Sequence, residues 1–335
     1  MTLRIGINGL GRIGRCLVRA LVENDVKDVE LVCANGPAPI ETHAHLLKYD
    51  SVHGRFGAEV KIEGNSLRIG RHIITITHEK DPAKLDWKKY RVDLVMECSG
   101  KFTTREAASA HLAAGAKRVL ISAPAPDADT TIVFGVNNHM LKKNHAVVSV
   151  GSCTTNALAP LAKALHEGVG IESGFMTTIH AYTGDQNLVD GSHKDLRRAR
   201  AAALSMVPTN TGAAKAIGLV LPELEGRLDG TAIRVPVPNV SLVDFTFQAS
   251  RDTSRDEINT LLTKAAAAYP HGVLHVSQEK LVSTDYSHTL YSSIVDASGT
   301  YVTGKRLVRL ASWYDNEWAF SCRMWDVARL WAGLS

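Results

Sequence analysis

The segment GSCTTN, residues 151–156, is the first candidate for chemistry because it places Cys153 among small polar residues at the predicted start of a helix. A thiolate there is favoured by the helix dipole and by backbone N–H groups, which would also stabilise an oxyanion. The segment TTIHAYT places His180 on a predicted strand, where a lone histidine is usually structural. A cysteine and a distant histidine that meet in the fold activate a thiol, because the imidazolium holds the thiolate and later moves protons. We therefore predict Cys153 as a nucleophile and His180 as its base.

The other cysteines do not suggest a second site. The chain has five cysteines, an odd number, without CxxC pairs or a His/Cys metal spacing. We expect no disulfide scaffold and no metal site. The remaining four are interpreted as small core residues: Cys16, Cys33, Cys98 and Cys322.

The N-terminal segment GINGLGRIG has the G-x-G-x-x-G spacing of a dinucleotide-binding turn, directly after a predicted strand and before a predicted helix. The first glycine permits the tight turn, the second lets backbone approach a pyrophosphate, and the third lets helix and strand pack closely. Arg12 is expected to pair with the pyrophosphate, although a solvated residue at the helix start is the alternative. The cofactor-binding residues predicted from this turn are Asn8, Gly9, Gly11, Arg12, Ile13 and Gly14.

The end of the second predicted strand lacks a residue that this kind of turn requires. An Asp or Glu about 20 residues after the glycines normally accepts hydrogen bonds from the ribose hydroxyls. Here Asn35 and Gly36 occupy that position, and Glu41 lies too far beyond the strand end to replace it. Because a carboxylate would repel a 2′-phosphate, its absence removes a barrier to NADP. We predict that Asn35 and Gly36 belong to the cofactor site.

Hydroxyl, carboxylate and basic side chains recur in four segments of the second half of the chain: YTGDQ, HKDLRRAR, PTNTGAAKA and AIRVPVPN. Each residue taken singly is more readily explained as a solvated or capping group. Collectively they suggest an acidic substrate. The side chains are those of Thr183, Asp185, Arg197, Arg198, Arg200, Thr211 and Arg234, and Gly212 follows Thr211 in the third segment.

The elements that must position these residues fall into two parts. In the first half, short β-rich runs such as LRIGING, VELVCAN, VDLVMECSG and KRVLISAP alternate with helical patterns, which predicts a parallel sheet with crossover helices. From about Ser152, one helix is followed by longer strands. The fold class is therefore α/β. A Rossmann-type doubly wound domain is expected over residues 1–151, completed by an amphipathic C-terminal helix at 318–335, with an α+β catalytic domain and a mainly antiparallel sheet at 152–317.

Composition excludes several classes of protein. The 335 residues are 45% hydrophobic and 21% charged, and the formal charge is +4 without a run of five basic residues. We expect anionic small molecules rather than nucleic acid as ligands. The apolar stretches fall short of the roughly 18 residues that span a bilayer, and the N-terminus carries no signal or transit pattern, so we expect a cytoplasmic protein without membrane contact.

The ordered set of motifs resembles the phosphorylating glyceraldehyde-3-phosphate dehydrogenase family over essentially the whole chain. The segments that carry the resemblance are INGLGRIGR, HLLKYDSVHG, ISAPAPD, SCTTN, IHAYTGDQ, HKDLRRARAAA, PTNTGAAKAIGLVLPEL, RVPVPNVSLVDF and SWYDNEW. The resemblance implies that Cys153 attacks an aldehyde, that hydride leaves to a nicotinamide, and that inorganic phosphate releases 1,3-bisphosphoglycerate from the thioester. His180 would be the base and the partner of the thiolate.

The same resemblance implies further roles. Thr183 and Arg234 would clamp the phosphate of the substrate. The inorganic phosphate site would contain Ser152, Thr154, Thr211 and Gly212, with Arg198 nearby. At the cofactor site, Asn316 would bind the nicotinamide amide, and Ser99 and Ser122 would line the crevice. The segment 182–206, here called the S-loop, would lie against the cofactor of a neighbouring subunit in a homotetramer.

Three positions depart from the NAD-restricted pattern of that family. Gly36 replaces its aspartate, Gly191-Ser192 replaces a Leu-Pro pair in the S-loop, and Gly184 replaces an asparagine. A missing carboxylate admits a 2′-phosphate, and Ser192 could donate a hydrogen bond to it from a neighbouring subunit. We therefore expect use of both NAD and NADP. The alternative is drift, in which Gly36 only weakens NAD binding, by about 1.5–3 kcal/mol at most.

Two rival functions remain open at this point. An erythrose-4-phosphate dehydrogenase would resemble this family but release its acid by water, and the segment PTNTGAAKA argues for phosphorolysis instead. A cofactor-binding protein without catalysis, acting on RNA or on a surface partner, should lack the Cys/His pair or carry a basic stripe. The sequence leaves open whether the reaction runs toward glycolysis or gluconeogenesis.

Overall fold

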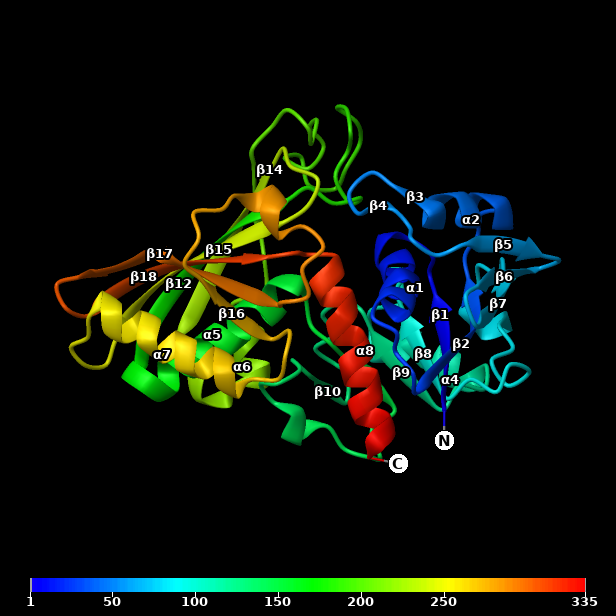
Figure 1. The fold of residues 1–335 in the computed structure, drawn as a ribbon, viewed down its shortest axis with the longest axis horizontal. Coiled ribbons are helices and arrows are strands. Elements are labelled where there is room, and N and C mark those ends of the chain that lie inside the picture. The colour runs from blue at the N-terminus through cyan, green and yellow to red at the C-terminus, as the bar shows by residue number, and fades with distance from the viewer. Residues whose placement is uncertain (1, 335) are drawn as a thin grey trace. The chain divides into compact units, whose positions relative to one another are not determined.

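The computed structural model describes residues 2–334, which form two compact units. The first unit contains the chain up to Ser152 together with the residues from Ser321 onward, and the second unit is Cys153–Phe320. Each unit is built around its own sheet (Figure 1). Within the described residues, no helix combines the length and apolar character that a membrane crossing requires.

The first unit has a nine-stranded sheet in the order β10-β11-β9-β8-β1-β2-β7-β6-β5. All neighbouring pairs from β10 to β7 are parallel, and only β6 runs antiparallel to its two neighbours. The predicted parallel sheet is therefore confirmed. The strands are β1 (Leu3–Asn8), β2 (Val29–Asn35), β5 (Val60–Glu63), β6 (Ser66–Ile69), β7 (His72–Thr77), β8 (Leu94–Glu97), β9 (Arg118–Ile121), β10 (Thr130–Thr131) and β11 (Val147–Ser149), beside a separate pair β3 (Tyr49–Asp50) and β4 (Gly54–Arg55).

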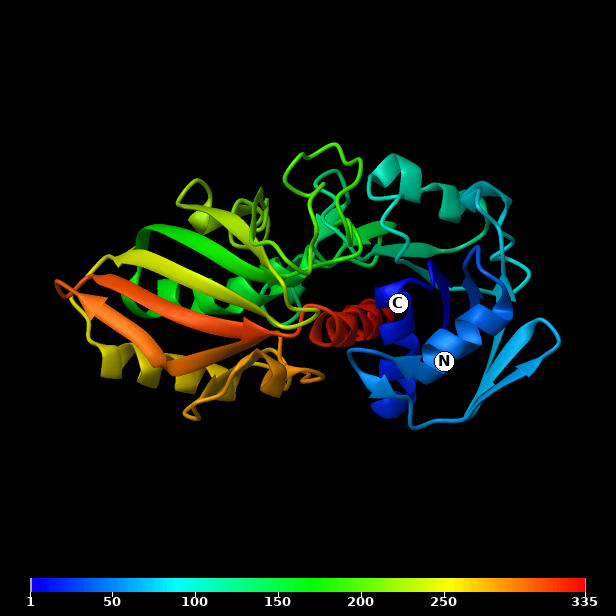
Figure 2. The same ribbon diagram turned by 90° about the horizontal axis from the view of Figure 1, so that it is seen from above.

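Helices cover both faces of this sheet, as expected for doubly wound connections. In Figure 2, α1 and α2 lie on one side of the strands and α3 and α4 on the other. The amphipathic α1 begins at the glycine turn and buries Leu17 and Leu21. The helices of this unit are α1 (Arg12–Glu23), α2 (Ile40–Lys48), α3 (Arg105–Ala108), α4 (Ala110–Ala113) and the 3-10 turns η1 (Pro82–Lys84) and η2 (Asn138–Met140).

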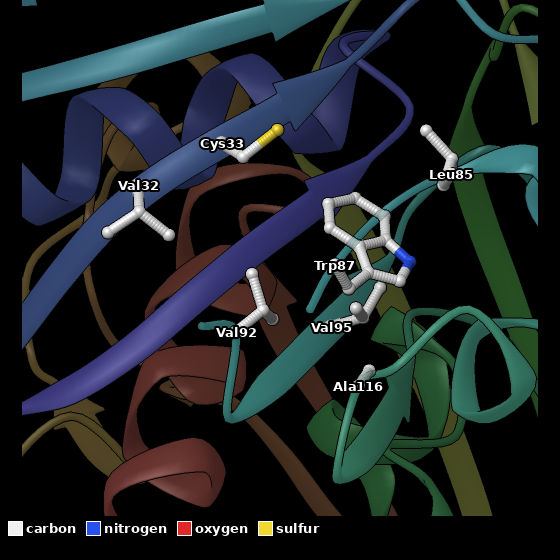
Figure 3. Close-up of a cluster of buried hydrophobic side chains, with 7 residues drawn as sticks. All are labelled: Val32, Cys33, Leu85, Trp87, Val92, Val95 and Ala116. Carbon is white, nitrogen blue, oxygen red and sulfur yellow. The ribbon is translucent and has the colours of Figure 1, made fainter. Parts of the chain in front are cut away.

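A tryptophan fills the centre of one hydrophobic cluster beneath the central strands (Figure 3). Trp87 packs among Val32, Cys33, Val92 and Val95, and its ring lies so close to β1 that a β-carbon on Gly6 would come within 2.7 Å of it. The indole nitrogen donates to Nδ1 of His111 at 3.1 Å, so the buried polar atom is satisfied. This packing fixes β1 and β2, whose carboxyl ends carry the glycine turn and Asn35.

The second unit has a seven-stranded mixed sheet in the order β13-β14-β12-β15-β18-β17-β16. Four of its neighbouring pairs are antiparallel, but β12/β14 and β16/β17 are parallel, because long connections separate the partners in sequence. The helices α5 and α7 contact each other and pack against the sheet (Figure 1). The elements are α5 (Cys153–Val169), β12 (Ile171–Ala181), β13 (Val207–Asn210), α6 (Ile217–Val220), η3 (Pro222–Leu224), β14 (Leu228–Val235), β15 (Ser241–Ala249), α7 (Arg255–Ala268), β16 (Leu274–Ser277), η4 (Ser283–Tyr286), β17 (Ser293–Thr303) and β18 (Leu307–Tyr314).

The last helix, α8 (Trp318–Gly333), begins in the second unit and continues into the first. Asp315 starts it, because its Oδ1 accepts hydrogen bonds from the backbone nitrogens of Glu317 and Trp318. Beyond Ser321 the helix belongs to the first unit, where the Trp325 indole donates to the carbonyl of Leu17 at 3.0 Å.

Candidate active site

Two elements of the second unit bring the predicted nucleophile and base together. Cys153 is the first residue of α5, and His180 lies one residue before the end of β12. Sγ of Cys153 is 3.5 Å from Nε2 of His180, within hydrogen-bonding distance for sulfur. Backbone hydrogen bonds from Cys153 and Thr154 at the helix start favour the charged form of the thiol. Although the two residues are far apart in the chain, the fold places them in direct contact.

The other ring nitrogen of His180 is surrounded by polar atoms of neighbouring strands. Nδ1 lies 2.7 Å from the carbonyl oxygen of Ala181 and 2.6 Å from Nη1 of Arg234, and Nη1 also donates to that carbonyl at 2.8 Å. Register pairs His180 directly with Arg234 across β12 and β14. These contacts fit two tautomers: Nδ1 either donates to Ala181 or accepts from Arg234. Only the first leaves Nε2 free to accept the thiol proton.

Burial opposes charge on both members of the pair. It lowers the pKa of His180 to about 3, and the positive charge of Arg234 acts in the same direction. Burial also raises the pKa of the Cys153 thiol, although Arg234 and hydrogen bonds from Thr154 partly offset this effect. Both shifts oppose the expected thiolate–imidazolium pair, because burial disfavours the charged form of each group.

Tyr314 was not predicted from the sequence, yet it supports both elements of the pair. Its hydroxyl lies 2.9 Å from Oγ1 of Thr154 on α5 and 2.8 Å from Oγ1 of Thr178 on β12. Its ring also meets the His180 ring edge-on, with centroids 5.9 Å apart. Thr154 was predicted at a phosphate site. In the structure its hydroxyl contacts Tyr314, and both its hydroxyl and its backbone N–H act on the Cys153 thiol.

Arg198 of the S-loop is held by three side chains. It pairs with the Asp185 carboxylate, donates from Nε to Oγ1 of Thr209 at 3.0 Å, and lies 3.7 Å from Asp195. Partial burial would raise the pKa of Asp185, but the hydrogen bond and charge of Arg198 outweigh it and lower that pKa. Asp185 was predicted in the phosphate-binding group. In the structure its carboxylate positions Arg198 and, being anionic, is unsuited to touch a phosphate.

The remaining predicted residues of the second unit lie in loops at the ends of strands. Thr183 follows β12, and Thr211 follows β13 with its Oγ1 accepting from the Ala213 nitrogen at 3.2 Å. Gly212 is exposed with open space where a side chain would be. Asn316 is buried, and its Oδ1 accepts from Oγ of Ser241 at 2.9 Å, which fixes the plane of its amide.

A cavity of about 420 Å³ opens at the glycine turn of the first unit, lined by Asn8, Gly9, Gly11 and Ser99 among others. Gly9 has a φ of +102°, and a β-carbon there would lie 2.5 Å from the Ser99 nitrogen. A β-carbon on Gly14 would lie 2.0 Å from the Gly9 carbonyl oxygen, whereas at Gly11 the space is open. The turn thus has the shape that a pyrophosphate requires, with backbone N–H groups of Arg12, Ile13 and Gly14 at the start of α1.

A hydrogen-bond network joins the carboxyl ends of four adjacent strands behind this cavity. Asn8 of β1 donates to Glu97 of β8 at 2.6 Å and accepts from Asn35 of β2 at 2.8 Å, while Thr77 of β7 donates to Asn35 at 2.9 Å. Glu97, which sequence reasoning missed, also accepts from the nitrogen and hydroxyl of Ser99. Asn35 was predicted to bind cofactor, but Glu79 backbone atoms take its two remaining hydrogen-bonding positions. Its side chain is therefore structural.

Arg12 differs from the expectation. Its guanidinium donates twice to the Asp50 carboxylate, at 2.6 and 3.2 Å, and it is not among the residues that line the cavity. Buried Asp50 provides a fixed partner that lies 38 residues away in the chain, which local sequence could not reveal. Arg15, one turn later on α1, lines the cavity instead.

Ser122 and Ser192, the two serines predicted at the cofactor site besides Ser99, lie in different surroundings. The backbone nitrogen of Ser122, just past β9, donates to the Glu97 carbonyl at 3.0 Å. Ser192 is exposed in the S-loop. The same loop exposes large apolar side chains, with Leu196 at 83% and Leu204 at 86%.

Comparisons with known proteins agree with both units. The family model for the NAD binding domain of glyceraldehyde 3-phosphate dehydrogenase matches residues 3–105, and the model for its C-terminal domain matches residues 152–316. The chain is similar to proteins named glyceraldehyde-3-phosphate dehydrogenase from Xanthobacter flavus and Cereibacter sphaeroides, each 56% identical over 98% of both chains. The protein of that name from Geobacillus stearothermophilus is 52% identical over the same shares. The chain therefore belongs to the glyceraldehyde-3-phosphate dehydrogenase family.

Proposed function

We propose that this protein oxidises D-glyceraldehyde 3-phosphate to 1,3-bisphosphoglycerate, using inorganic phosphate and either NAD or NADP. The observation that carries this proposal is the 3.5 Å contact between Cys153 Sγ and His180 Nε2, with Arg234 against the same imidazole. A thiol, a neutral base and guanidinium groups together suit acyl transfer between anionic partners.

The first step is attack of the thiol on the aldehyde carbon. With Nδ1–H donated to the Ala181 carbonyl, Nε2 of His180 accepts the thiol proton as the S–C bond forms. The proton then passes to the aldehyde oxygen and gives a thiohemiacetal. Backbone N–H groups at the start of α5 stabilise the negative charge on that oxygen during the attack.

The second half of the reaction forms and cleaves a thioester. A bound nicotinamide, with its amide held by Asn316, would supply the acceptor for the hydride that leaves the thiohemiacetal carbon. His180 takes the hydroxyl proton in the same step, leaving a thioester on Cys153, and releases that proton to solvent. Inorganic phosphate then attacks the thioester carbon and the C–S bond breaks. The proton that the phosphate loses passes through His180 to the departing thiolate.

The anion sites follow from the charged residues around His180. Arg234 retains a buried Nε without a partner among the described residues, which leaves a donor for the substrate phosphate beside Thr183. Arg198 is close enough for its charge to lower the pKa of His180 further, after burial and Arg234. We assign it, with the helix start at Ser152 and Thr154 and with Thr211 and Gly212, to inorganic phosphate. Asn316 would bind the nicotinamide amide.

Cofactor binding is assigned to the glycine turn and the cavity beside it, with Ser99 at the cavity wall. Ser122, whose backbone nitrogen donates to the Glu97 carbonyl, is assigned to the same site. Dual use of NAD and NADP is supported by Gly36 in place of a carboxylate and by Ser192 in the S-loop. A 2′-phosphate would meet no repelling side chain at position 36.

A homotetramer in the cytoplasm is part of the proposal. The S-loop exposes five large apolar side chains, more than a monomer of this size normally leaves in one segment. They are Leu188, Val189, Leu196, Leu204 and Met206. Burial of this segment against a neighbouring subunit would cover them. Dual cofactor use is compatible with either a glycolytic or a gluconeogenic direction.

The decisive experiment measures kcat/KM for NAD and for NADP separately, with saturating glyceraldehyde 3-phosphate and with phosphate present or absent. Comparable values for both cofactors that are lost without phosphate support the proposal. Activity that persists without phosphate would favour hydrolytic release, as in the erythrose-4-phosphate alternative. Activity with NAD alone would reject dual cofactor use.

A further inference from the structure

His43 is a buried histidine without hydrogen-bond partners at the edge of the cofactor cavity. It lies on α2, its side chain is only 4% exposed, and it lines the cavity together with Pro37 and Thr42. Among the described residues, neither Nδ1 nor Nε2 forms a hydrogen bond. Buried polar atoms almost always have a partner, so two unsatisfied ring nitrogens in a ligand cavity point to a group that the ligand brings.

The imidazole of His43 occupies the space that a side chain at position 36 would need. A β-carbon on Gly36 would lie 2.7 Å from Nε2 and 2.8 Å from Cε1 of that ring. The φ of Gly36 is not positive, so the backbone does not require glycine there. The glycine instead makes room for the histidine. Where a carboxylate would accept from the ribose hydroxyls, this protein has an imidazole.

Positive charge predominates around this ring. Arg15, Lys80 and Lys101 line the same cavity with a single carboxylate, Glu79, and His78 lies beside it with Nδ1 3.0 Å from the Gly36 carbonyl oxygen. Burial lowers the pKa of His43, and the charges of His78 and Arg15 act in the same direction. The backbone carbonyls of Gly36 and Ala38 favour the protonated ring, although neither meets the geometry of a hydrogen bond to it. Burial and the neighbouring cations therefore favour the neutral ring in the absence of a bound anion.

We propose that His43 recognises the ribose 2′-phosphate of NADP, taking up a proton as the dianion enters and donating a hydrogen bond to it from Nε2. This inference rests on the proposed dual use of NAD and NADP. A neutral imidazole could serve a ribose hydroxyl, but the excess of cations over carboxylates in this cavity favours an anion. A phosphate close to the ring would raise its pKa, so binding and proton uptake are coupled.

The test compares two small probes that differ only in the 2′-phosphate: adenosine 2′,5′-bisphosphate and 5′-AMP. Titration calorimetry with the full-length protein gives both dissociation constants and, in two buffers of different ionisation enthalpy, the protons taken up. His43→Leu removes the donor at similar volume, and His43→Asn keeps a shorter polar group. His45→Asn, at an exposed position on the same helix, is the matched control.

We expect the wild type to bind the bisphosphate more tightly than 5′-AMP. Protons should be taken up only when the bisphosphate binds, so the affinity for the bisphosphate should increase as the pH falls from 8.5 to 7. In His43→Leu the ratio of the two affinities should fall about ten- to hundredfold, as for loss of a charge-assisted hydrogen bond. His43→Asn should lose the proton uptake. His45→Asn should behave as the wild type.

The outcomes separate this inference from the proposed function. If the wild type neither prefers the bisphosphate nor turns over NADP, dual cofactor use is rejected and His43 has no such role. If the wild type prefers the bisphosphate but the His43 variants retain the ratio and the proton uptake, only the role of His43 is rejected. If the His43 variants lose affinity equally for both probes, His43 only packs the cavity wall and the inference is rejected.

Discussion

Gly36 and His43 are complementary in space: a β-carbon at position 36 would lie 2.7 Å from Nε2 of the histidine. An aspartate at position 36 would therefore require the present imidazole to shift. The missing carboxylate and the buried histidine are one structural feature distributed over the end of β2 and the helix α2. Neither residue can be interpreted alone.

Installing a carboxylate should require both positions to change. We expect Gly36→Asp alone to destabilise the protein by about 1–3 kcal/mol, because the new side chain overpacks against His43. Gly36→Asp combined with His43→Leu should recover much of that loss and restrict the enzyme to NAD, since a carboxylate repels the 2′-phosphate. Denaturant unfolding and the NAD/NADP ratio of kcat/KM measure the two effects. Additive stability changes would contradict the predicted coupling.

Cys153 should be the cysteine that iodoacetamide alkylates first at pH 7. It contacts His180 and is partly exposed, whereas Cys16, Cys33 and Cys322 are buried. Cys98 is also partly exposed, but burial of its thiol raises its pKa. Because burial raises the pKa of Cys153 too, its alkylation rate should keep rising above pH 7. Peptide mass spectrometry over time identifies the labelled cysteine. Earlier labelling of Cys16, Cys33, Cys98 or Cys322 would refute this prediction.

Removing the base should affect chemistry more than binding. We expect His180→Asn to lower kcat by about 10²–10⁴-fold with a smaller change in KM, because the proton acceptor for the thiol and the thiohemiacetal is lost. The kcat from steady-state kinetics and the alkylation rate of Cys153 should both decrease in this variant. His271→Asn, at an exposed position of the same unit, is the control and should leave both rates unchanged. A variant with full activity would exclude general-base catalysis by His180.

The tyrosine behind the pair should matter for stability and for geometry. Tyr314→Phe removes the hydroxyl that bonds to Thr154 and Thr178, leaving buried hydroxyls without that partner, so we expect a loss of about 1–3 kcal/mol. Displacement of α5 against β12 should also lower kcat. Tyr301→Phe, at a largely exposed position, is the matched control. Equal stability of the two variants in denaturant titrations would argue against the bridging role.

Stability should decrease in mild acid. The pKa of His180 is about 6.5 in an unfolded chain but about 3 in the folded protein, so between these values the unfolded state binds a proton that the folded state does not. Stability therefore rises with pH in this window, and lowering the pH from 6.5 to 5 should cost about 2 kcal/mol for this residue. His43 and His72, whose pKa values burial also lowers, act with the same sign. Denaturation midpoints of the wild type and of His180→Asn should be measured across this pH range. The midpoint should depend less steeply on pH in the variant than in the wild type.

Local patterns in the sequence were sufficient for several features. The glycine turn, the parallel sheet and the positions of Cys153 and His180 depend on spacing, periodicity and motifs within short segments. Gly9 and Gly14 have the close backbone contacts that the turn predicts.

Features that depend on distant contacts were missed or misassigned. Arg12 pairs with Asp50, Asn35 is satisfied by Asn8 and Glu79, and Tyr314 reaches Thr154 across 160 positions of the chain. The pKa shifts of His180 and Cys153 also escaped prediction, because desolvation depends on how tightly their surroundings pack. His43 appears unremarkable in sequence, and only its burial beside Gly36 identifies it.

The network at the strand ends has a consequence for how this cavity can change over evolutionary time. Since every polar atom of the Asn35 side chain is bonded to protein, β2 offers no side chain that could read the ribose. The helix α2 instead contributes Thr42, His43 and Leu46 to the cavity wall. A substitution on that helix alters the lining without disturbing the bonds that join β8, β1, β2 and β7. The cavity lining can thus diverge while the strand ends stay fixed, provided that the residue at position 36 leaves room for the side chain at position 43.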